Sequence, residues 1–279
     1  MNDEGNAGAP VPRHRNCGVI YVATGNDYRD LARQSAITLK AHNPGLPVDL
    51  FTDDLARADR QIFDAVHKVP KNHDRAKLEC LPLSRFDRTL YLDCDTLILR
   101  SFGDLFALAD RFDLSLAHDV RRRSELVRQG LEEVTPYAFP QLNSGVMVYR
   151  KSAVMLAFFA EWARRYHAHP EIGRDQVFLK DMLWSSGLSF YVLPPEFNLR
   201  RVTMLDAWEP LDAAPTIIHS HRLLDHIRKP GATRINDIGD ILKAERLALL
   251  DEWQDAHATK KRPRPGDIGT WALSGNDQD

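Results

Sequence analysis

Cysteine is scarce in this chain, which has only three among its 279 residues, Cys17, Cys80 and Cys94. They are too few and too far apart to form a disulfide framework, and the sequence contains no CxxC or Cys/His spacing of the kind that holds structural zinc. Free thiols are typical of proteins in a reducing compartment, so we expect a cytoplasmic location.

Long apolar runs and an excess of one charge are also missing. No stretch approaches the roughly 18–20 apolar residues that cross a membrane, and residues 1–12 lack the apolar run of a signal peptide. The formal net charge of −2 provides no basic field for nucleic acid, so we expect no nucleic-acid partner. The clusters Arg121–Arg123 and Lys260–Arg262 are interpreted as solvated surface. With Trp271, the basic tail would support only a weak contact with a membrane.

The composition is that of a folded protein with loose ends. Apolar residues make up 43% and charged residues 27% of the chain, and the length suits one α/β domain. Residues 1–16 predict a disordered leader and residues 259–279 a flexible tail, because both are rich in charge, Gly and Pro. The folded domain is therefore expected over 17–258.

Short apolar runs of strand type alternate with helical segments between these ends. We expect strands at 18–24, 48–52, 65–69, 89–92, 114–117, 145–149, 190–193 and 216–218, and helices at 27–41, 75–81, 105–109, 153–167, 175–185 and 241–256. Such alternation predicts a mostly parallel sheet with helices on both faces, which binds its ligands at the carboxyl ends of the strands. The polar segment 118–140 has the length of an active-site loop.

Two details of the core are also predicted. The inward face of helix 153–167 is expected to carry Leu156, Phe159, Ala160 and Ala163. Trp162 and Trp184 lie in helical patterns and are expected in the core.

Two carboxylates follow directly upon the strand at 89–92. Asp93 and Asp95 are separated by one residue, and where the chain leaves extended geometry both side chains can turn toward one ligand. Carboxylates so close together repel each other unless a cation lies between them. A hard divalent ion such as Mn²⁺ or Mg²⁺ suits these oxygens and also binds diphosphate. The triplet alone is common in solvated turns, and its place after a buried strand is what favours a metal site.

Further motifs occur in a consistent order along the chain. They are YVATGNDY at 21–28, KL at 77–78, RTLYLDCDTLIL at 88–99 with DLF at 104–106, LNSGVMVY at 142–149, DQ at 175–176, FNL at 197–199 and IIH at 217–219. Together they resemble glycosyltransferase family 8, which includes glycogenin and bacterial lipopolysaccharide galactosyltransferases. The resemblance implies a single-domain GT-A fold with a Rossmann-like central sheet. It also implies retaining transfer of a hexose from a nucleotide-sugar, usually a UDP-hexose, with Mn²⁺ as cofactor.

The resemblance implies a role for individual residues as well. The metal ligands would be Asp93, Asp95 and His219. The catalytic residues would be Gln176, Asp175 and Lys77. The residues that bind the nucleotide-sugar donor would be Thr24, Asn26, Asp27, Tyr28, Lys77, Asp93, Cys94, Asn143, Ser144, Asp175 and Lys229. Other readings stay open for three of these segments. Tyr28 would also suit a core aromatic, residues 143–145 a turn before a strand, and Asp175 the first turn of a helix, where the dipole favours an acid.

The expected mechanism follows from the chemistry of Gln176. The resemblance implies that this residue lies near the anomeric carbon of the transferred sugar. Its amide oxygen is neutral and a poor nucleophile, so we prefer same-face attack in which the leaving phosphate takes the proton of the acceptor. Positive charge from Lys77 and from a late lysine such as Lys229 would stabilise the departing diphosphate.

The late metal-binding motif departs from the family pattern. Instead of His-(Phe/Tyr)-x-Gly-x-x-Lys-Pro-Trp, the chain has a longer spacing between His219 and the pair Lys229-Pro230, and Gly231 replaces the tryptophan. His219 or His221 would be the third metal ligand, and we favour His219. The placement of Lys229 at the phosphate is open for the same reason.

Two other classes of function compete with a glycosyltransferase. A nucleotidyltransferase that makes nucleotide sugars would usually carry a Gly-rich basic loop after its first strand, which residues 23–28 lack. A non-catalytic nucleotide-sugar binder would be expected to lose one of the acidic motifs. The sequence fixes neither the donor sugar, nor the acceptor (a glycan, a lipid-linked or a small molecule), nor the oligomeric state. Trp208 would suit either an acceptor pocket or a packed loop, and Tyr137 is a poor candidate for self-glycosylation.

Overall fold

The computed structural model describes residues 16–119, 130–131, 135–136, 138–201, 204–205, 209 and 211–259. The two basic clusters, Tyr137 and Trp208 lie outside these residues, as do the predicted leader except Asn16 and the predicted tail except Thr259. The chain divides into two compact units, and each is described by itself. The first consists of Met1–Arg200 and Leu211–His221, and the second of Arg201–Pro210 and Arg222–Asp279.

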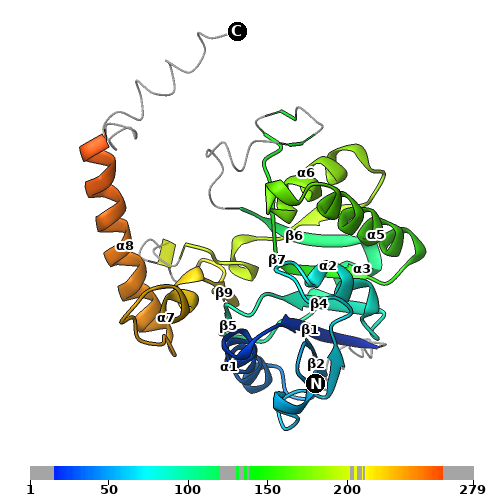
Figure 1. The fold of residues 1–279 in the computed structure, drawn as a ribbon, viewed down its shortest axis with the longest axis horizontal. Helices are drawn as coiled ribbons and strands as arrows, with labels where there is room; N and C mark the ends of the chain where they lie inside the picture. Colours follow the sequence, from blue (N-terminus) through cyan, green and yellow to red (C-terminus); the bar gives the residue numbers. More distant parts are fainter. Residues whose placement is uncertain are drawn as a thin grey trace, which may run out of the picture. The chain divides into compact units, whose positions relative to one another are not determined.

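The first unit contains a seven-stranded sheet (Figure 1). Its strands, in spatial order, are β3 (Ala65–Lys68), β2 (Val48–Thr52), β1 (Cys17–Ala23), β4 (Arg88–Leu92), β7 (Leu142–Arg150), β6 (Leu114–His118) and β8 (Phe190–Val192). All neighbours pair in parallel except β7, which is antiparallel to both β4 and β6. The start of β7 therefore lies beside the carboxyl end of β4. A second, two-stranded sheet pairs β5 (Thr96–Ile98) with β9 (Ile217–His219).

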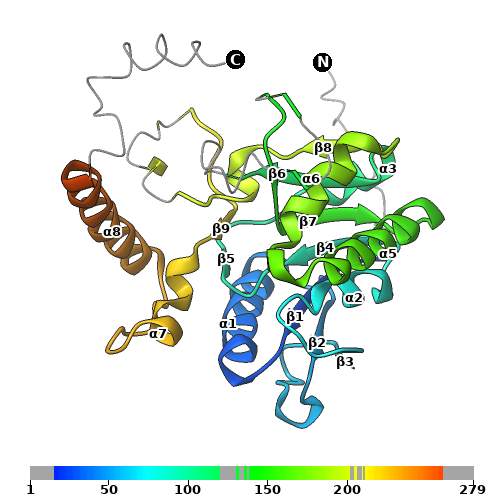
Figure 2. The same cartoon turned by 45° about the horizontal axis from the view of Figure 1, so that its top comes forward.

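Helices cover both faces of the large sheet (Figures 1 and 2). Among its described residues, the helices of this unit are α1 (Asn26–His42), α2 (Lys77–Cys80), α3 (Leu108–Arg111), α5 (Ala153–Ala168) and α6 (Asp175–Ser185). Short 3-10 turns lie at η1 (Leu55–Arg57), η2 (Leu81–Leu83), η3 (Leu105–Ala107), η4 (Pro170–Ile172) and η5 (Pro195–Phe197). A further turn, η7 (His221–Leu224), begins in this unit with His221, and its other residues belong to the second unit. On one face, Tyr21 of β1 hydrogen-bonds Ser35 of α1 at 2.8 Å. On the other, Ile20 and Tyr91 join the core that α5 and α6 share.

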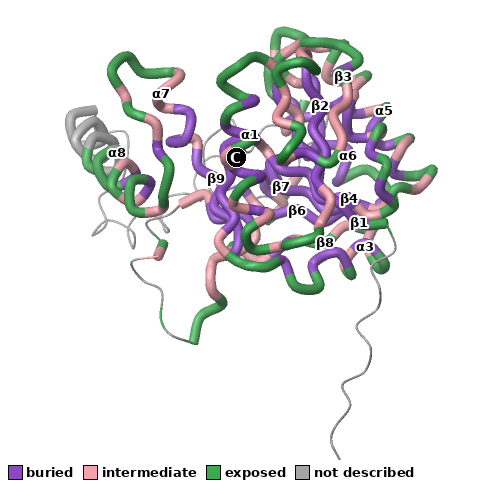
Figure 3. Tube along the Cα trace, turned by 90° about the horizontal axis from the view of Figure 1, so that it is seen from below, coloured by how far each residue is buried: buried purple, intermediate pink, exposed green. Residues whose placement is uncertain are grey.

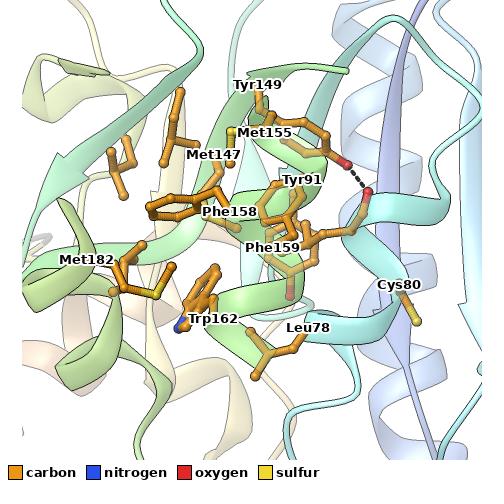
Figure 4. Packing of buried hydrophobic residues seen from close by; sticks show 14 of the residues in the cluster. Leu78, Cys80, Tyr91, Met147, Tyr149, Met155, Phe158, Phe159, Trp162 and Met182 are labelled. Atoms are coloured by element: carbon orange, nitrogen blue, oxygen red, sulfur yellow. Dashed lines mark hydrogen bonds between the residues drawn. The ribbon is translucent and has the colours of Figure 1, made fainter. Parts of the chain in front are cut away.

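That core is rich in aromatic side chains (Figure 4). Trp162 of α5 is fully buried, and its indole N–H donates to the carbonyl of Asp175 at 2.8 Å. The ring of Phe159 meets Tyr149 edge-on, with centroids 4.9 Å apart. The central strands are buried along their length (Figure 3). A well-packed core therefore directly supports the first turn of α6, which carries Asp175 and Gln176.

One buried hydrogen bond of this core allows a test of the packing. The hydroxyl of Tyr149 donates to the carbonyl of Leu81 at 2.6 Å (Figure 4). Tyr149→Phe would leave that carbonyl without this donor, so the free energy of unfolding should fall by about 1–3 kcal/mol. Urea unfolding measures the loss. Tyr191→Phe is the control, since Tyr191 is 37% exposed, and an equal loss in both variants would contradict the assignment.

The second unit, among its described residues, contains α7 (Asp225–Arg228) and α8 (Ile238–Thr259). Arg222 lies 3.4 Å from Glu245 of α8 and 3.9 Å from Asp225, so ion pairs link its helical segments. No helix within the described ranges has the length and apolar character needed to span a membrane.

The predicted α/β class is confirmed, as is the mostly parallel central sheet flanked by helices. Three details are wrong. The buried face of α5 carries Met155, Phe158, Phe159 and Trp162, while Leu156, Ala160 and Ala163 lie more outward. The buried face contains the largest apolar side chains of the helix, so it removes more apolar area from water than the predicted face would. Trp184 is 43% exposed and packs edge-on against Phe139, and β7 begins three residues earlier than predicted.

Candidate active site

The two predicted metal-binding carboxylates lie between two strands. Asp93 follows β4 directly, and Asp95 immediately precedes β5. The N–H of Asp93 donates to the carbonyl of Gly145 at 2.7 Å, and the hydroxyl of Thr96 donates to the carbonyl of Asp93 at 2.9 Å. The main chain that carries both carboxylates is thus held by β7 on one side and by β5 on the other.

His219, the last residue of β9, joins these carboxylates. The pairing of β5 with β9 sets His219 opposite Thr96. Its Nε2 atom lies 3.4 Å from Asp95 Oδ1 and 3.7 Å from Asp93 Oδ2. One ligand atom from each of the three residues lies within 4.8 Å of the others, an arrangement that could hold a metal ion. His221 falls in the turn η7 and is outside this cluster.

A chain of amides determines which nitrogen of His219 carries its proton. Asn143 Oδ1 accepts from the N–H of Gly145 at 3.0 Å, which fixes the orientation of the Asn143 amide. Asn198 Nδ2 donates to the same oxygen at 3.0 Å, so Asn198 Oδ1 faces His219 Nδ1, also at 3.0 Å. Since a carbonyl oxygen only accepts, Nδ1 is the donor. Nε2 is therefore the nitrogen that faces the two carboxylates, and when the ring is neutral its lone pair can bind a metal ion, as in metal-binding histidines.

Gly145 makes room for this histidine. A Cβ atom at this position would come within 2.0 Å of His219 Cε1 and 2.7 Å of Asp93 Oδ2. No side chain can be tolerated there without moving the cluster. The glycine of the 142–149 motif is thus explained by the close approach of β7 to the candidate metal ligands.

Basic groups hold the buried carboxylate Asp95 in its charged form. Burial by itself would raise the pKa of Asp95, but His219 and Arg200 outweigh it, so the pKa lies below the usual value. Arg200 Nη1 lies 2.9 Å from Nε2 and 3.3 Å from Nδ1 of His219. Nη1 is nearly as close to Nδ1 as to Nε2, so it cannot lie in the plane of the ring on the outer side of Nε2. The guanidinium therefore lies against the face of the His219 ring.

Lys77, the first residue of α2, connects the two acidic motifs. Its ammonium lies 2.9 Å from Ser144 Oγ, 3.4 Å from Asp175 Oδ2 and 3.7 Å from Asp93 Oδ1. Arg75 holds the other oxygen of Asp175 at 2.9 Å. Burial would raise the pKa of Asp175, but these two cations lower it below the ordinary value. Four residues predicted for the site are therefore in direct contact through one lysine.

Gln176 and Asn143 meet a carboxylate that the motifs did not single out. Asp119, at the end of β6, accepts from Gln176 Nε2 at 3.3 Å and from Asn143 Nδ2 at 3.4 Å. It is only 9% exposed. Asp119 lies at the start of the segment predicted to be an active-site loop, and its position directly after a strand was the only sequence signal.

The first loop lies at the carboxyl end of β1. Tyr28 is 38% exposed and not part of the core. Asn26 Oδ1 accepts from Arg29 at 2.5 Å and from Arg57 at 3.0 Å. Asp53 was not predicted, yet it accepts from the N–H of Gly25 at 3.0 Å and from Arg29 at 2.5 Å. Asp53 and Arg29 thus hold the loop that contains Thr24, Asn26 and Asp27.

Two predicted donor-binding side chains are engaged elsewhere. Cys94 is buried, and its thiol donates to the carbonyl of Val22 at 3.3 Å. Contact between Cys94 and the nucleotide-sugar stays a prediction. Because the thiol is engaged by Val22, such a contact would have to come from the main-chain atoms of Cys94. Lys229 belongs to the second unit, where its ammonium lies 3.0 Å from Asp225.

The buried thiols should be chemically inert in the folded protein. Burial raises the pKa of Cys80 to about 12, and burial followed by Asp93 and Asp95 raises the pKa of Cys94 well above its usual value. Because the thiolate is the reactive form, none of the three cysteines should react with Ellman's reagent at about pH 8. All three should react after unfolding in guanidinium chloride. A thiol that reacts at once in the native protein would contradict the burial.

A second histidine cluster consists of His73, Glu79 and His167. The two carboxylate oxygens of Glu79 lie at hydrogen-bond distance from the histidines, one 2.7 Å from His73 Nε2 and the other 2.5 Å from His167 Nε2. His73 Nδ1 accepts from the N–H of Arg75 at 3.2 Å, so the proton of this ring is on Nε2, facing Glu79. Direct hydrogen bonds explain this cluster, whereas Nε2 of His219 lies 3.4 Å and 3.7 Å from the carboxylates of Asp95 and Asp93, wider spacings that leave room for a metal ion.

The fold and the cluster define a class of protein before any comparison is made. A mostly parallel α/β sheet with polar groups at the carboxyl ends of adjacent strands is typical of nucleotide-binding enzymes. The family model of the nucleotide-diphospho-sugar transferases matches residues 88–227, half of the chain. The chain therefore belongs to the nucleotide-diphospho-sugar transferase family.

Two solved structures of the glycosyltransferase GlyE from Streptococcus pneumoniae TIGR4 are similar to this chain. One is 20% identical with a TM-score of 0.49, and covers 72% of this chain and 54% of GlyE. The apo form is 21% identical with the same TM-score, and covers 74% and 54%. The chain thus spans about half the length of the GlyE chains. No curated protein matches the chain in sequence.

Proposed function

We propose that the chain is a divalent-metal-dependent glycosyltransferase that moves a hexose from a nucleotide-sugar to an acceptor hydroxyl. The observation that carries this proposal is the Asp93–Asp95–His219 cluster at the carboxyl edge of the sheet, in a member of the nucleotide-diphospho-sugar transferase family. Assignment to glycosyltransferase family 8, a UDP-hexose donor and retention of configuration are parts of the same proposal.

The chemistry of the cluster suits Mn²⁺ or Mg²⁺. Asp93 and Asp95 offer carboxylate oxygens, and His219 offers Nε2 because Nδ1 donates to Asn198. Gly145 leaves the space in which these groups converge. A divalent cation held by the three residues would neutralise the charge that develops on a departing diphosphate.

The donor is assigned to the adjoining ends of β1 and β4, which are neighbours in the sheet. Thr24, Asn26, Asp27 and Tyr28 would hold the base and ribose. The exposed ring of Tyr28 supports stacking on a base. Asn26 Oδ1 already accepts from two arginines, so its contact with a nucleotide would use Nδ2 or the main chain.

The transferring sugar is assigned to Asn143, Ser144, Asp175 and Gln176. Asp175 is held ionised by Lys77 and Arg75, which suits an acceptor of hydrogen bonds from sugar hydroxyls. Gln176 donates from Nε2 to Asp119, which orients its amide.

The proposed step is same-face displacement at the anomeric carbon. The acceptor oxygen forms the new C–O bond, and the bond to the diphosphate breaks with its electron pair going to the phosphate oxygen. That oxygen takes the proton of the acceptor hydroxyl. The neutral oxygen of Gln176 would stabilise the positive carbon without forming a bond to it.

Incubation with UDP-glucose or UDP-galactose tests the proposal. Slow release of UDP without acceptor, only when Mn²⁺ is added, would support a glycosyltransferase. Pyrophosphate formed from UTP and a sugar phosphate would support a nucleotidyltransferase instead. If neither sugar nucleotide is hydrolysed or raises the melting temperature with Mn²⁺, the proposal is wrong in its donor. A sugar trapped covalently on Gln176 or Asp175 would overturn the same-face mechanism.

A further inference from the structure

Arg200 differs from the other cations of the candidate site in its partners. Lys77 and Arg75 both contact Asp175, and Lys77 also lies near Asp93. Within the described ranges, Arg200 has no carboxylate within the 4.0 Å of an ion pair, and its Nη1 contacts only His219. Its Nε is buried without a hydrogen-bond partner. Asp95, whose pKa Arg200 lowers, lies beyond that distance, so the guanidinium keeps donors with which it can bind a further anion.

The main chain presents Arg200 rigidly to the cluster. Leu199 pairs with β9: its N–H donates to Ile217 at 2.8 Å, and its carbonyl accepts from the N–H of His219 at 3.0 Å. The preceding residue, Asn198, orients the ring of His219. Three consecutive residues, Asn198, Leu199 and Arg200, therefore engage one histidine or its strand.

The position of the guanidinium indicates which anion it would meet. Nη1 lies 2.9 Å from Nε2 of His219, the atom available to a metal. Metal–nitrogen and metal–oxygen bonds are each about 2 Å long, so phosphate oxygens bound to the same cation would lie within a few ångströms of Arg200. Arginine also presents a planar set of donors that matches phosphate.

We propose that Arg200 binds the diphosphate of the donor, in the role that the sequence suggested for Lys229. This inference rests on the proposed function. Lys229 already has a carboxylate partner, Asp225, at 3.0 Å, whereas Arg200 has none among the described residues.

Calorimetric binding of UDP and UMP in the presence of Mn²⁺ tests the assignment, with GDP and GMP measured in parallel. Arg200→Ala should weaken binding of the diphosphate by about 10- to 100-fold, the value of a charge-assisted hydrogen bond, and binding of the monophosphate by much less. Arg200→Lys should recover part of the loss. Lys229→Ala and Arg164→Ala, the latter on α5 and paired with Glu161, should each change the affinity less than about 3-fold.

Binding of Mn²⁺ alone separates this role from a structural one. If Arg200 contacts the diphosphate, Arg200→Ala should bind Mn²⁺ without nucleotide at least as tightly as the wild type, because a positive charge near the cation is removed. An equal loss of Mn²⁺ and UDP affinity would mean that Arg200 only holds His219, and would overturn the assignment. So would unchanged discrimination between UDP and UMP, although the proposed function would then stand. If the wild type binds neither nucleoside diphosphate with Mn²⁺, the proposed function fails, and the assignment fails with it.

Discussion

Asp95→Asn is expected to remove the divalent cation and to slow sugar transfer by about 1,000-fold or more, since such a cation contributes several kcal/mol to departure of the diphosphate. The substitution preserves the shape of the side chain. It removes the buried negative charge that lies 3.4 Å from His219 Nε2. Calorimetric titration with Mn²⁺ and release of UDP from the sugar nucleotide measure the two effects.

Asp87→Asn is the matched control for this variant. Asp87 is exposed, and its side chain has no hydrogen bond or ion pair in the part of the chain that the structure describes. The Asp87→Asn variant should bind Mn²⁺ and release UDP as the wild type does. If Asp95→Asn keeps the Mn²⁺-dependent stabilisation by UDP, the metal site is not at this cluster.

Gly145→Ala should be nearly as damaging, although it adds only one methyl group. The new Cβ would lie 2.0 Å from His219 Cε1 and 2.7 Å from Asp93 Oδ2, so the ring and the carboxylate must both move. Overpacking of this kind costs about 1–3 kcal/mol of stability. Displacement of two ligands should weaken Mn²⁺ binding by about 100-fold or more, beyond the effect of a lost outer partner.

Gly187→Ala provides the comparison, because a Cβ there would meet no atom within 4 Å. Its melting temperature and Mn²⁺ affinity should stay close to those of the wild type. Wild-type affinity in Gly145→Ala would show that His219 does not lie against β7 when the metal is bound.

Much of the fold could be predicted because periodic apolar patterns report burial. The strand at 48–52 and the helix at 175–185 have the predicted bounds. The start of β7 could not be predicted, because residues 143–145 resemble a turn until Asn143 pairs with β6 and the carbonyl of Gly145 accepts from the N–H of Asp93. Likewise, the helix expected at 75–81 continues into a 3-10 turn at Leu81–Leu83, where Pro82 has no N–H to donate.

The sequence likewise indicated some residues of the candidate site and not others. Asp93 and Asp95 could be recognised because they directly follow a buried strand, whereas Asp175 and Gln176 could be recognised only through the family resemblance, since their position alone indicates the first turn of a helix. Asp119 and Asp53 each follow a strand directly but belong to none of the recognised motifs, and no local pattern distinguishes Arg200. Their importance arises from contacts across the sheet, such as the 3.3 Å contact between Asp119 and Gln176, which no spacing along the chain reveals.

The reversed direction of β7 couples the candidate metal site to the folding of the core. One end of this strand supplies Asn143 to Gly145, while its other end supplies Met147 and Tyr149 to the interior. A slip of one residue against β4 would turn Met147 outward and at the same moment bring Ser144 or Val146 to the place of the glycine. Misregistered molecules would thus lose the candidate metal site and the packing together, so we expect the molecules that bind Mn²⁺ to be the correctly paired ones.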